Sequence, residues 1–262
     1  MTHYQTIKFE KIEAGVFITL NRPDVHNALN EAMIAELTEA ISLSAEDPKS
    51  RYVMIQGAGK SLCAGADIHW MQQMANYTFQ ENVADARKLA DLFKTIYQAK
   101  LPVIVHAKGS VFGGGVGLVA ACDIVIAETE TVFCLSEVKL GMIPAVISPY
   151  IIRAMGERQA KRYALTAERL TATEACQIGL VHQLVTSTQA EAELIKLQKA
   201  LLLGSPMAQQ HTKRLFKAVS NQPITQEVHE MTASAIAEAR ASLDGKEGLR
   251  AFLEKRQPSW GQ

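Results

Sequence analysis

The chain has 262 residues, of which 48% are hydrophobic and 21% charged, and its 27 basic side chains balance its 27 acidic ones. This composition is typical of a soluble globular protein with one large domain, or one domain and an appendage. The zero net charge gives no electrostatic footprint for nucleic acid or an anionic membrane. We find no signal peptide and no apolar run long enough to span a bilayer, so we expect a cytoplasmic protein. The four scattered cysteines predict reduced thiols, and the histidines lack metal-ligand spacing.

The first part of the chain predicts alternating strands and helices. Residues 4–20 alternate polar and apolar side chains around Glu13-Ala14-Gly15, which predicts a β-hairpin. Asn30 is a typical N-cap for the helix that the following apolar spacing indicates. The next elements expected are a buried strand at 52–57, a helix over 79–99, a strand at 101–107 and a strand at 123–127.

The later part of the chain becomes entirely helical. A helix is expected at 157–166, and another at 171–178 opens with a capping box formed by Thr171 and Glu174. A strand at 180–185 closes the alternating part, and only helices follow, including 206–221 and 225–242. We therefore predict an α/β layered body over residues 1–200 and a helical C-terminal region over residues 201–262.

The run Gly113-Gly114-Gly115-Val116-Gly117 lies where the 101–107 strand gives way to a helix of small residues. Glycines at such a junction let a ligand approach the backbone closely and leave the first helical N–H groups unpaired. Those groups and the positive end of the helix dipole form a site for an anion or a developing oxyanion. Alone this signal is weak, because glycines also mark ordinary turns.

Three further motifs strengthen that interpretation. They are Asn21-Arg22-Pro23 with Asn27-Ala28-Leu29, then Cys63-Ala64-Gly65-Ala66-Asp67, then Leu135-Ser136-Glu137-Val138-Lys139-Leu140-Gly141-Met142-Ile143-Pro144. With the glycine run, in this order and spacing, the chain resembles the crotonase (enoyl-CoA hydratase/isomerase) superfamily over essentially its whole length. The resemblance implies a spiral of ββα units with a C-terminal helical trimerisation region, in a homotrimer or homohexamer.

The activity that the resemblance implies is chemistry at the α-carbon of an acyl-CoA thioester. Such reactions pass through an enolate, and two backbone N–H donors aimed at the thioester oxygen stabilise its charge. In the family the donors occupy the positions of Ala66 and Gly114. Removing one such donor typically costs roughly 3 kcal/mol of barrier. The two amides supply the electrophile, so the resemblance implies no metal and no cofactor beyond the CoA of the substrate.

The resemblance also implies where CoA binds. Arg22 and Val25 would flank its phosphate and pantetheine portion. The adenine and pantetheine pocket would be formed by Ala28, Ala64, Asp67 and Ile68. Lys255, of this chain or of a neighbouring subunit, is a candidate phosphate partner, and an ordinary solvated lysine is an equal interpretation.

The chain departs from the family at one catalytic position. Typical hydratases use two glutamates, and here Gly117 replaces the first while Glu137 supplies the second. Two mechanisms remain open: Glu137 activates water and protonates Cα in a hydratase, or it carries a proton between C2 and C4 in a Δ3,Δ2-enoyl-CoA isomerase. The apolar neighbours Leu135, Met142 and Ile143 predict a raised pKa for Glu137, which suits either role.

The loop after Pro144 also departs from common hydratases. The stretch Ser136–Tyr150 resembles bacterial hydratases of branched glutaconyl-CoA esters, the methylglutaconyl-CoA type of leucine breakdown. Candidate partners for the distal carboxylate of such a substrate are Lys139, Ser148, Tyr150 and Arg153. The rival function is a non-catalytic CoA-binding or RNA-binding member of the family, and the balanced charge argues against RNA.

Overall fold

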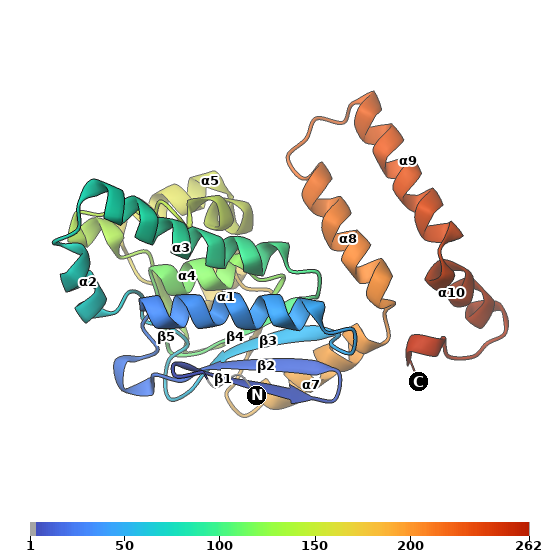
Figure 1. The fold of residues 1–262 in the computed structure, drawn as a ribbon, viewed down its shortest axis with the longest axis horizontal. Coiled ribbons are helices and arrows are strands. Elements are labelled where there is room, and N and C mark those ends of the chain that lie inside the picture. The colour runs from blue at the N-terminus through green and yellow to red at the C-terminus, as the bar shows by residue number, and fades with distance from the viewer. Residues whose placement is uncertain (1–3, 262) are drawn as a thin grey trace.

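The computed structural model describes residues 4–261, which form a layered α/β body with three helices standing to one side (Figure 1). A six-stranded sheet lies at the centre, in the order β1-β2-β3-β4-β6-β9. Its strands are β1 (Ile7–Ile12), β2 (Gly15–Leu20), β3 (Tyr52–Gly57), β4 (Val103–Ala107), β6 (Ile124–Glu128) and β9 (Gln183–Val185). The predicted hairpin is confirmed as the antiparallel pair β1–β2, and every other neighbouring pair is parallel.

Helices cover both faces of this sheet. On one side lie α1 (Glu31–Glu46), α3 (Phe79–Gln98) and α4 (Gly114–Ala121), and on the other lies α7 (Ala190–Leu202) (Figure 1). Alternate residues of β3 point to opposite faces of the sheet. Val53 and Ile55 belong to the main core, while Met54 belongs to a smaller cluster with Leu194 of α7. This alternation follows from the two-residue period of a strand.

A second, three-stranded sheet positions the glycine run and Glu137. It consists of β5 (Ser110–Phe112), β7 (Val132–Cys134) and β8 (Leu170–Thr171), with β7 in the middle. Just beyond β5, the N–H of Gly113 donates to the carbonyl of Cys134 at 2.9 Å. The glycine run is thereby held beside the end of β7, three residues before Glu137. Strands of two or three residues carry no recognisable periodicity, which is why the sequence did not predict this sheet.

Two predicted helix starts are confirmed by their caps. The side chain of Asn30 accepts from the N–H of Met33 at the start of α1, and Thr171 and Glu174 form the capping box of α6 (Ala172–Gln177). The helix predicted at 157–166 is confirmed as the second part of α5 (Ser148–Thr166), which is kinked at Gly156 (φ 77°, ψ 152°). The first part of α5 begins at Ser148, with a proline in its first turn. The kink separates two helical segments, of which the sequence pattern indicated only the second.

The C-terminal helices contact chiefly one another. They are α8 (Pro206–Val219), α9 (Gln226–Ala241) and α10 (Leu243–Leu253), so a separate helix follows the one predicted over 225–242. Lys213 of α8 joins them to the body, donating to the carbonyl of Leu101 at 2.7 Å and to Oδ2 of Asp123 at 2.5 Å. Arg51 donates to the carbonyl of Gly204 at 2.5 Å, in the connection between α7 and α8. None of the helices that residues 4–261 form is long and apolar enough to cross a membrane.

Candidate active site

The backbone N–H of Ala66 makes no hydrogen bond to any residue that the structure describes, because the residues on either side of it make the bonds that hold its loop. The N–H of Leu29 donates to the carbonyl of Gly65 at 2.7 Å, and the N–H of Asp67 donates to the carbonyl of Leu29 at 2.8 Å. In this parallel bridge the two neighbours of Ala66 make the hydrogen bonds, so its own N–H has no acceptor among residues 4–261. Ala66 is only half-buried, and its N–H is therefore available to a ligand.

The Gly114 amide is the second free donor. Gly114 is the first residue of α4, and Gly113 before it has φ 48° and ψ −117°, a conformation that favours glycine. The carbonyl of Gly113 accepts from Val116 at 2.9 Å, as the first turn of the helix requires. The N–H of Gly114 has no acceptor within the described part of the chain, because the first amides of a helix have no partner inside it.

The Glu137 carboxylate lies beside both loops. It opens the short 3-10 helix η2 (Glu137–Leu140) that follows β7. A Cβ atom placed on Gly113 would lie 3.3 Å from Oε1 of Glu137 and 3.9 Å from the Cα of Gly65. Three segments far apart in the sequence therefore meet at one point, and glycine at 113 keeps that point open.

The environment of Glu137 suits proton transfer. Its Oε2 atom is buried and has no hydrogen-bond partner among the residues that the structure describes. Burial raises the pKa of this carboxyl above its ordinary value of 4.5, with a backbone hydrogen bond opposing the rise. A buried carboxylate oxygen without a partner costs free energy unless a ligand or a water pairs with it. The arrangement therefore places a carboxylate that can accept a proton next to two free backbone N–H groups.

The family's other glutamate position holds Gly117, and the space around it is filled. A Cβ atom on Gly117 would lie 2.1 Å from Cγ2 of Ile147 and 3.1 Å from Cζ of Phe93. Such a separation from Cγ2 is far inside van der Waals contact. The sequence revealed the missing carboxylate, and the structure shows that side chains from α3 and from the residue before α5 occupy its place.

Arg22 and Asp67, both expected to bind CoA, have their side chains engaged within the protein. Nη2 of Arg22 donates to Oδ2 of Asp67 at 2.7 Å, and Nη1 donates to the carbonyl of Ala28 at 2.7 Å. Asp67 is only 4% exposed and caps α2 (Ile68–Met74) by accepting from the N–H groups of His69 and Trp70. Burial would raise the pKa of Asp67, but the hydrogen bonds from Arg22 and the helix N–H groups outweigh it and hold the pKa low.

Asn27 is a structural residue of this site whose role the sequence analysis missed. It is fully buried, its Oδ1 accepts from the N–H of Arg22, and its Nδ2 donates to the carbonyls of Ala58 and Ser61. Its φ of 55° lies in the left-handed region, which Asn tolerates better than most residues. The sequence could have indicated this role, because Asn27 lies in a loop between a predicted strand and a predicted helix, where asparagine often adopts a left-handed conformation.

The remaining predicted CoA contacts divide into two groups. Val25 of the 3-10 helix η1 (Pro23–Val25) and Ile68 are exposed, whereas Ala28 is buried and Ala64 half-buried, and all four belong to the loops around Ala66. Lys255 is exposed and follows α10, and α10 and α2 lie at opposite ends of the molecule (Figure 1). A single chain does not bring Lys255 to these loops.

Comparisons with known proteins agree with this geometry. The family model described as "Enoyl-CoA hydratase/isomerase" matches residues 11–262. The chain belongs to the enoyl-CoA hydratase/isomerase family. It is 33% identical to the crotonyl-CoA hydratase of Syntrophomonas wolfei over 262 residues, which cover 98% of each chain.

Solved structures show the same fold. An enoyl-CoA hydratase from Shewanella pealeana is 38% identical, with a TM-score of 0.95 over 98% of this chain and 96% of the other. An enoyl-CoA hydratase/isomerase from Marinobacter aquaeolei is 33% identical, with a TM-score of 0.92 over 98% and 99%. The predicted crotonase fold and the prediction that the protein is an enzyme of this family are confirmed.

Proposed function

We propose that the protein is a hydratase that adds water across the 2,3 double bond of 3-methylglutaconyl-CoA or a related branched glutaconyl-CoA. The observation that carries the proposal is the position of the Glu137 carboxylate, beside Gly113 and Gly65 and hence beside the free amides of Gly114 and Ala66. A hydratase needs a base for water and donors for an enolate, and both are within one small volume.

The reaction proceeds in two steps on one face of the substrate. Water held by Glu137 attacks C3, its proton passes to the carboxylate, and the C2–C3 π electrons move to the thioester oxygen. The N–H groups of Ala66 and Gly114 stabilise that oxyanion. The enolate then collapses and takes the proton at C2 from the Glu137 carboxyl group, which restores the carboxylate. One carboxylate suffices for this syn addition, and no metal and no cofactor besides the CoA of the substrate takes part.

The glutaconyl part of the proposal rests on the region after Pro144. The Tyr150 ring lies 5.9 Å from that of Phe93, which borders Gly117, and 5.6 Å from that of Tyr97. The guanidinium of Arg153 lies 5.9 Å from the centroid of Tyr97. The side chains of Ser148, Lys139 and Arg153 donate to the backbone carbonyls of Ala145, Ala167 and Pro149. Tyr150 is therefore the preferred partner for a distal carboxylate.

The proposal is tested by following the absorbance of the conjugated thioester. Purified protein is given 3-methylglutaconyl-CoA, crotonyl-CoA and a 3-enoyl-CoA in parallel, for the wild type, Glu137→Gln and the exposed control Glu130→Gln. We expect loss of absorbance with the glutaconyl ester, abolished by Glu137→Gln and unchanged in the control. A gain of absorbance from the 3-enoyl ester alone would make the protein an isomerase, the second candidate that a single carboxylate supports. Inactivity on all three esters would favour a binding role.

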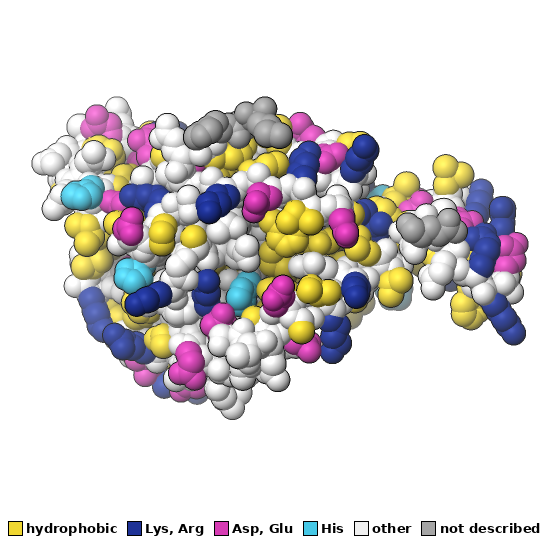
Figure 2. Space-filling view, turned by 90° about the horizontal axis from the view of Figure 1, so that it is seen from below, with side chains coloured by type: hydrophobic (Ala, Val, Ile, Leu, Met, Phe, Trp, Pro, Cys, Tyr) yellow, Lys and Arg dark blue, Asp and Glu magenta, His cyan; other side chains and the backbone are white. Residues whose placement is uncertain are grey.

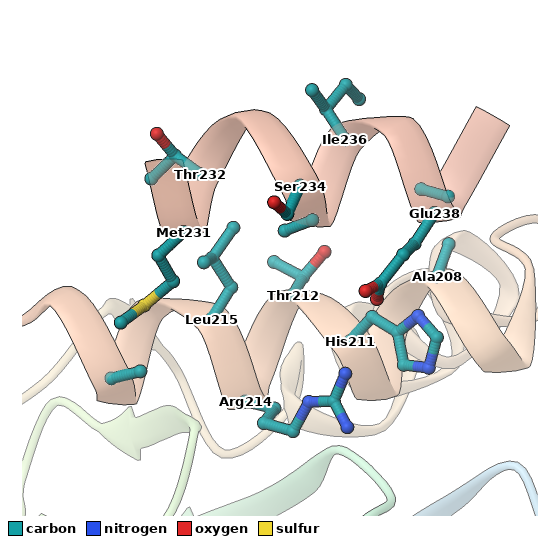
Figure 3. A pocket seen from close by; sticks show the side chains of 13 residues that line it. Ala208, His211, Thr212, Arg214, Leu215, Met231, Thr232, Ser234, Ile236 and Glu238 are labelled. Atoms are coloured by element: carbon teal, nitrogen blue, oxygen red, sulfur yellow. The ribbon is translucent and has the colours of Figure 1, made fainter. Parts of the chain in front are cut away.

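A homotrimer or homohexamer is also part of the proposal. Helices α8 and α9 enclose an open groove of about 510 Å³, in which Leu215 and Met231 point toward each other (Figure 3). The C-terminal helices and their connections expose large apolar side chains, namely Phe216, Ile224, Ile236, Leu243, Leu249, Phe252 and Leu253. Light scattering of the purified protein measures the oligomeric state directly, and a monomeric mass would contradict this part.

Binding to RNA is less compatible with the surface. On the face seen from below, basic and acidic side chains are interspersed rather than segregated (Figure 2). Nucleic-acid sites instead gather positive charge along a groove or stripe. A gel shift with RNA at physiological salt checks this expectation, and retention of the RNA would contradict it.

A further inference from the structure

Two glycines at the start of α4 have different neighbours. A Cβ atom on Gly113, the residue before the helix, would meet the Glu137 carboxylate, whereas a Cβ atom on Gly117, inside the helix, would meet Ile147. Gly117 occupies the position at which typical hydratases of the family carry their other glutamate. The Ile147 side chain therefore fills the space into which a side chain on residue 117 would project.

Ile147 is held firmly in this place. It is 3% exposed, and its carbonyl accepts from the N–H groups of Tyr150 and Ile151 in the first turn of α5. Phe93, the other neighbour of Gly117, is fully buried on α3. A side chain on residue 117 could be accommodated only by moving the start of α5 or the core of α3, and close-packed interiors resist such movements.

We propose that Ile147 is a specificity-determining residue, which occupies the place of the second carboxylate and forms an apolar wall of the acyl site beside Glu137. The inference rests on the proposed function and deepens it. Residues 117 and 147 act as a coupled pair: a small residue at 117 requires a large apolar one at 147. This pair restricts the enzyme to single-carboxylate chemistry and disfavours short unbranched 2-enoyl esters.

The packing half of the inference is tested by a double-mutant cycle on stability. Gly117→Ala, Ile147→Ala and the double variant are compared by thermal unfolding, with Ile151→Ala as a control that removes equal bulk from the same helix. Gly117→Ala alone should lower the melting temperature by about 5 °C, because it overpacks a rigid site. In the Ile147→Ala background the same change should lower it less, because the closest contact, with Cγ2, is gone although the Cβ of residue 147 remains 2.8 Å away. In the Ile151→Ala background it should retain its full effect. Equal effects in all three backgrounds would overturn the inference without any measurement of turnover.

The specificity half is tested by the ratio of two activities, which does not depend on how much protein is folded. For the wild type, Ile147→Ala and Gly117→Glu/Ile147→Ala, kcat/KM is measured with crotonyl-CoA and with 3-methylglutaconyl-CoA. The double variant should raise the ratio in favour of crotonyl-CoA by at least about tenfold, which corresponds to about 1.4 kcal/mol of discrimination. An unchanged ratio overturns the specificity role alone. A wild type that turns over neither ester instead contradicts the proposed function, so the two failures are distinguishable.

A pH profile separates this role from simple packing. Ile147→Ala admits water beside Glu137, and because burial raises the pKa of that carboxyl, the acid limb of kcat/KM should move to lower pH. The Ile151→Ala control should leave the limb in place. A limb that moves equally in both variants would contradict a specific contact between Ile147 and the site.

Discussion

Arg22 and Asp67 are joined by a 2.7 Å ion pair immediately behind the Ala66 amide. The two residues are 45 positions apart, and Asp67 also caps α2 and donates its own N–H to Leu29. The direction of the Ala66 N–H is thus set by an interaction that lies outside the reacting atoms. An ion pair that orients a loop acts on turnover through the position of that loop.

Arg22→Ala should lower the free energy of unfolding by about 2–3 kcal/mol at pH 7, since it leaves the buried Asp67 carboxylate without its cation. The pKa of Asp67 is lowered in the folded state, so its contribution is present above the unfolded pKa and is lost as pH falls through the folded pKa. Urea unfolding at pH 7 and near pH 2.5 should therefore show the difference shrinking in acid. The exposed pair of Lys11 and Asp47 is the control, and Lys11→Ala should change stability much less than Arg22→Ala does. A pH-independent loss would contradict the ion-pair account.

Gly114→Pro should remove one oxyanion donor while preserving the helix. Proline is well tolerated at the first helical position, where its missing N–H has no intrahelical partner. We expect kcat to fall by about 10²–10³-fold with little change in KM. Gly114→Ala is the matched control: it keeps the N–H and adds a Cβ 3.0 Å from Cδ1 of Leu29, a terminal methyl group that can shift. Equal losses in both variants would mean that the Cβ, not the amide, is responsible.

Glu137 should dominate the acid side of the pH profile. Hydration requires the carboxylate, and burial raises the pKa of Glu137, so the midpoint of the acid limb should lie above 4.5. The raised pKa also means that the ionised group destabilises the fold: stability falls as pH rises above the unfolded value. Glu137→Gln should therefore melt higher than the wild type at pH 8 and equally near pH 4, while losing at least about 10²-fold in activity. A melting temperature that falls at pH 8 would contradict the buried, unpaired state of this carboxylate.

Much of the architecture could be predicted from the sequence. The hairpin and the caps at Asn30 and Thr171 depend on local residue types, which one chain displays directly. The roles of Ala66, Gly114 and Glu137 were inferred instead from the resemblance of their motifs to the family, and they stay predictions. The sequence could not predict that Ile147 fills the space next to Gly117. The two residues are 30 positions apart, and their contact depends on where α5 begins. The Arg22–Asp67 ion pair could not be predicted for the same reason. The sequence does not tell whether a charged residue near a binding motif pairs with a ligand or with another side chain of the protein.

Lys213→Met should loosen the attachment of α8. Its ammonium group pairs with Asp123, whose pKa is raised by burial even though Lys213 and the N–H of Val103 oppose the rise. The variant leaves that carboxylate with fewer donors, and we expect a loss of about 1–3 kcal/mol in unfolding free energy. Chemical denaturation measures it, and Lys213→Met/Asp123→Asn should recover part of the loss because the uncompensated charge is gone. No recovery in the double variant would contradict a charge-based attachment.

The attachment through Lys213 and Arg51 also has a dynamic consequence. Helices α8–α10 pack chiefly on one another, and they lie close to the strands of the sheet at few points. Regions held by few buried contacts open at lower free energy than the core. In an isolated chain, amide hydrogen exchange should therefore show two tiers, with rapid exchange in α8–α10 and slow exchange in β3 and β4. Helices α8–α10 can therefore separate from the body and pack against it again while the sheet, and the loops around Glu137, stay folded.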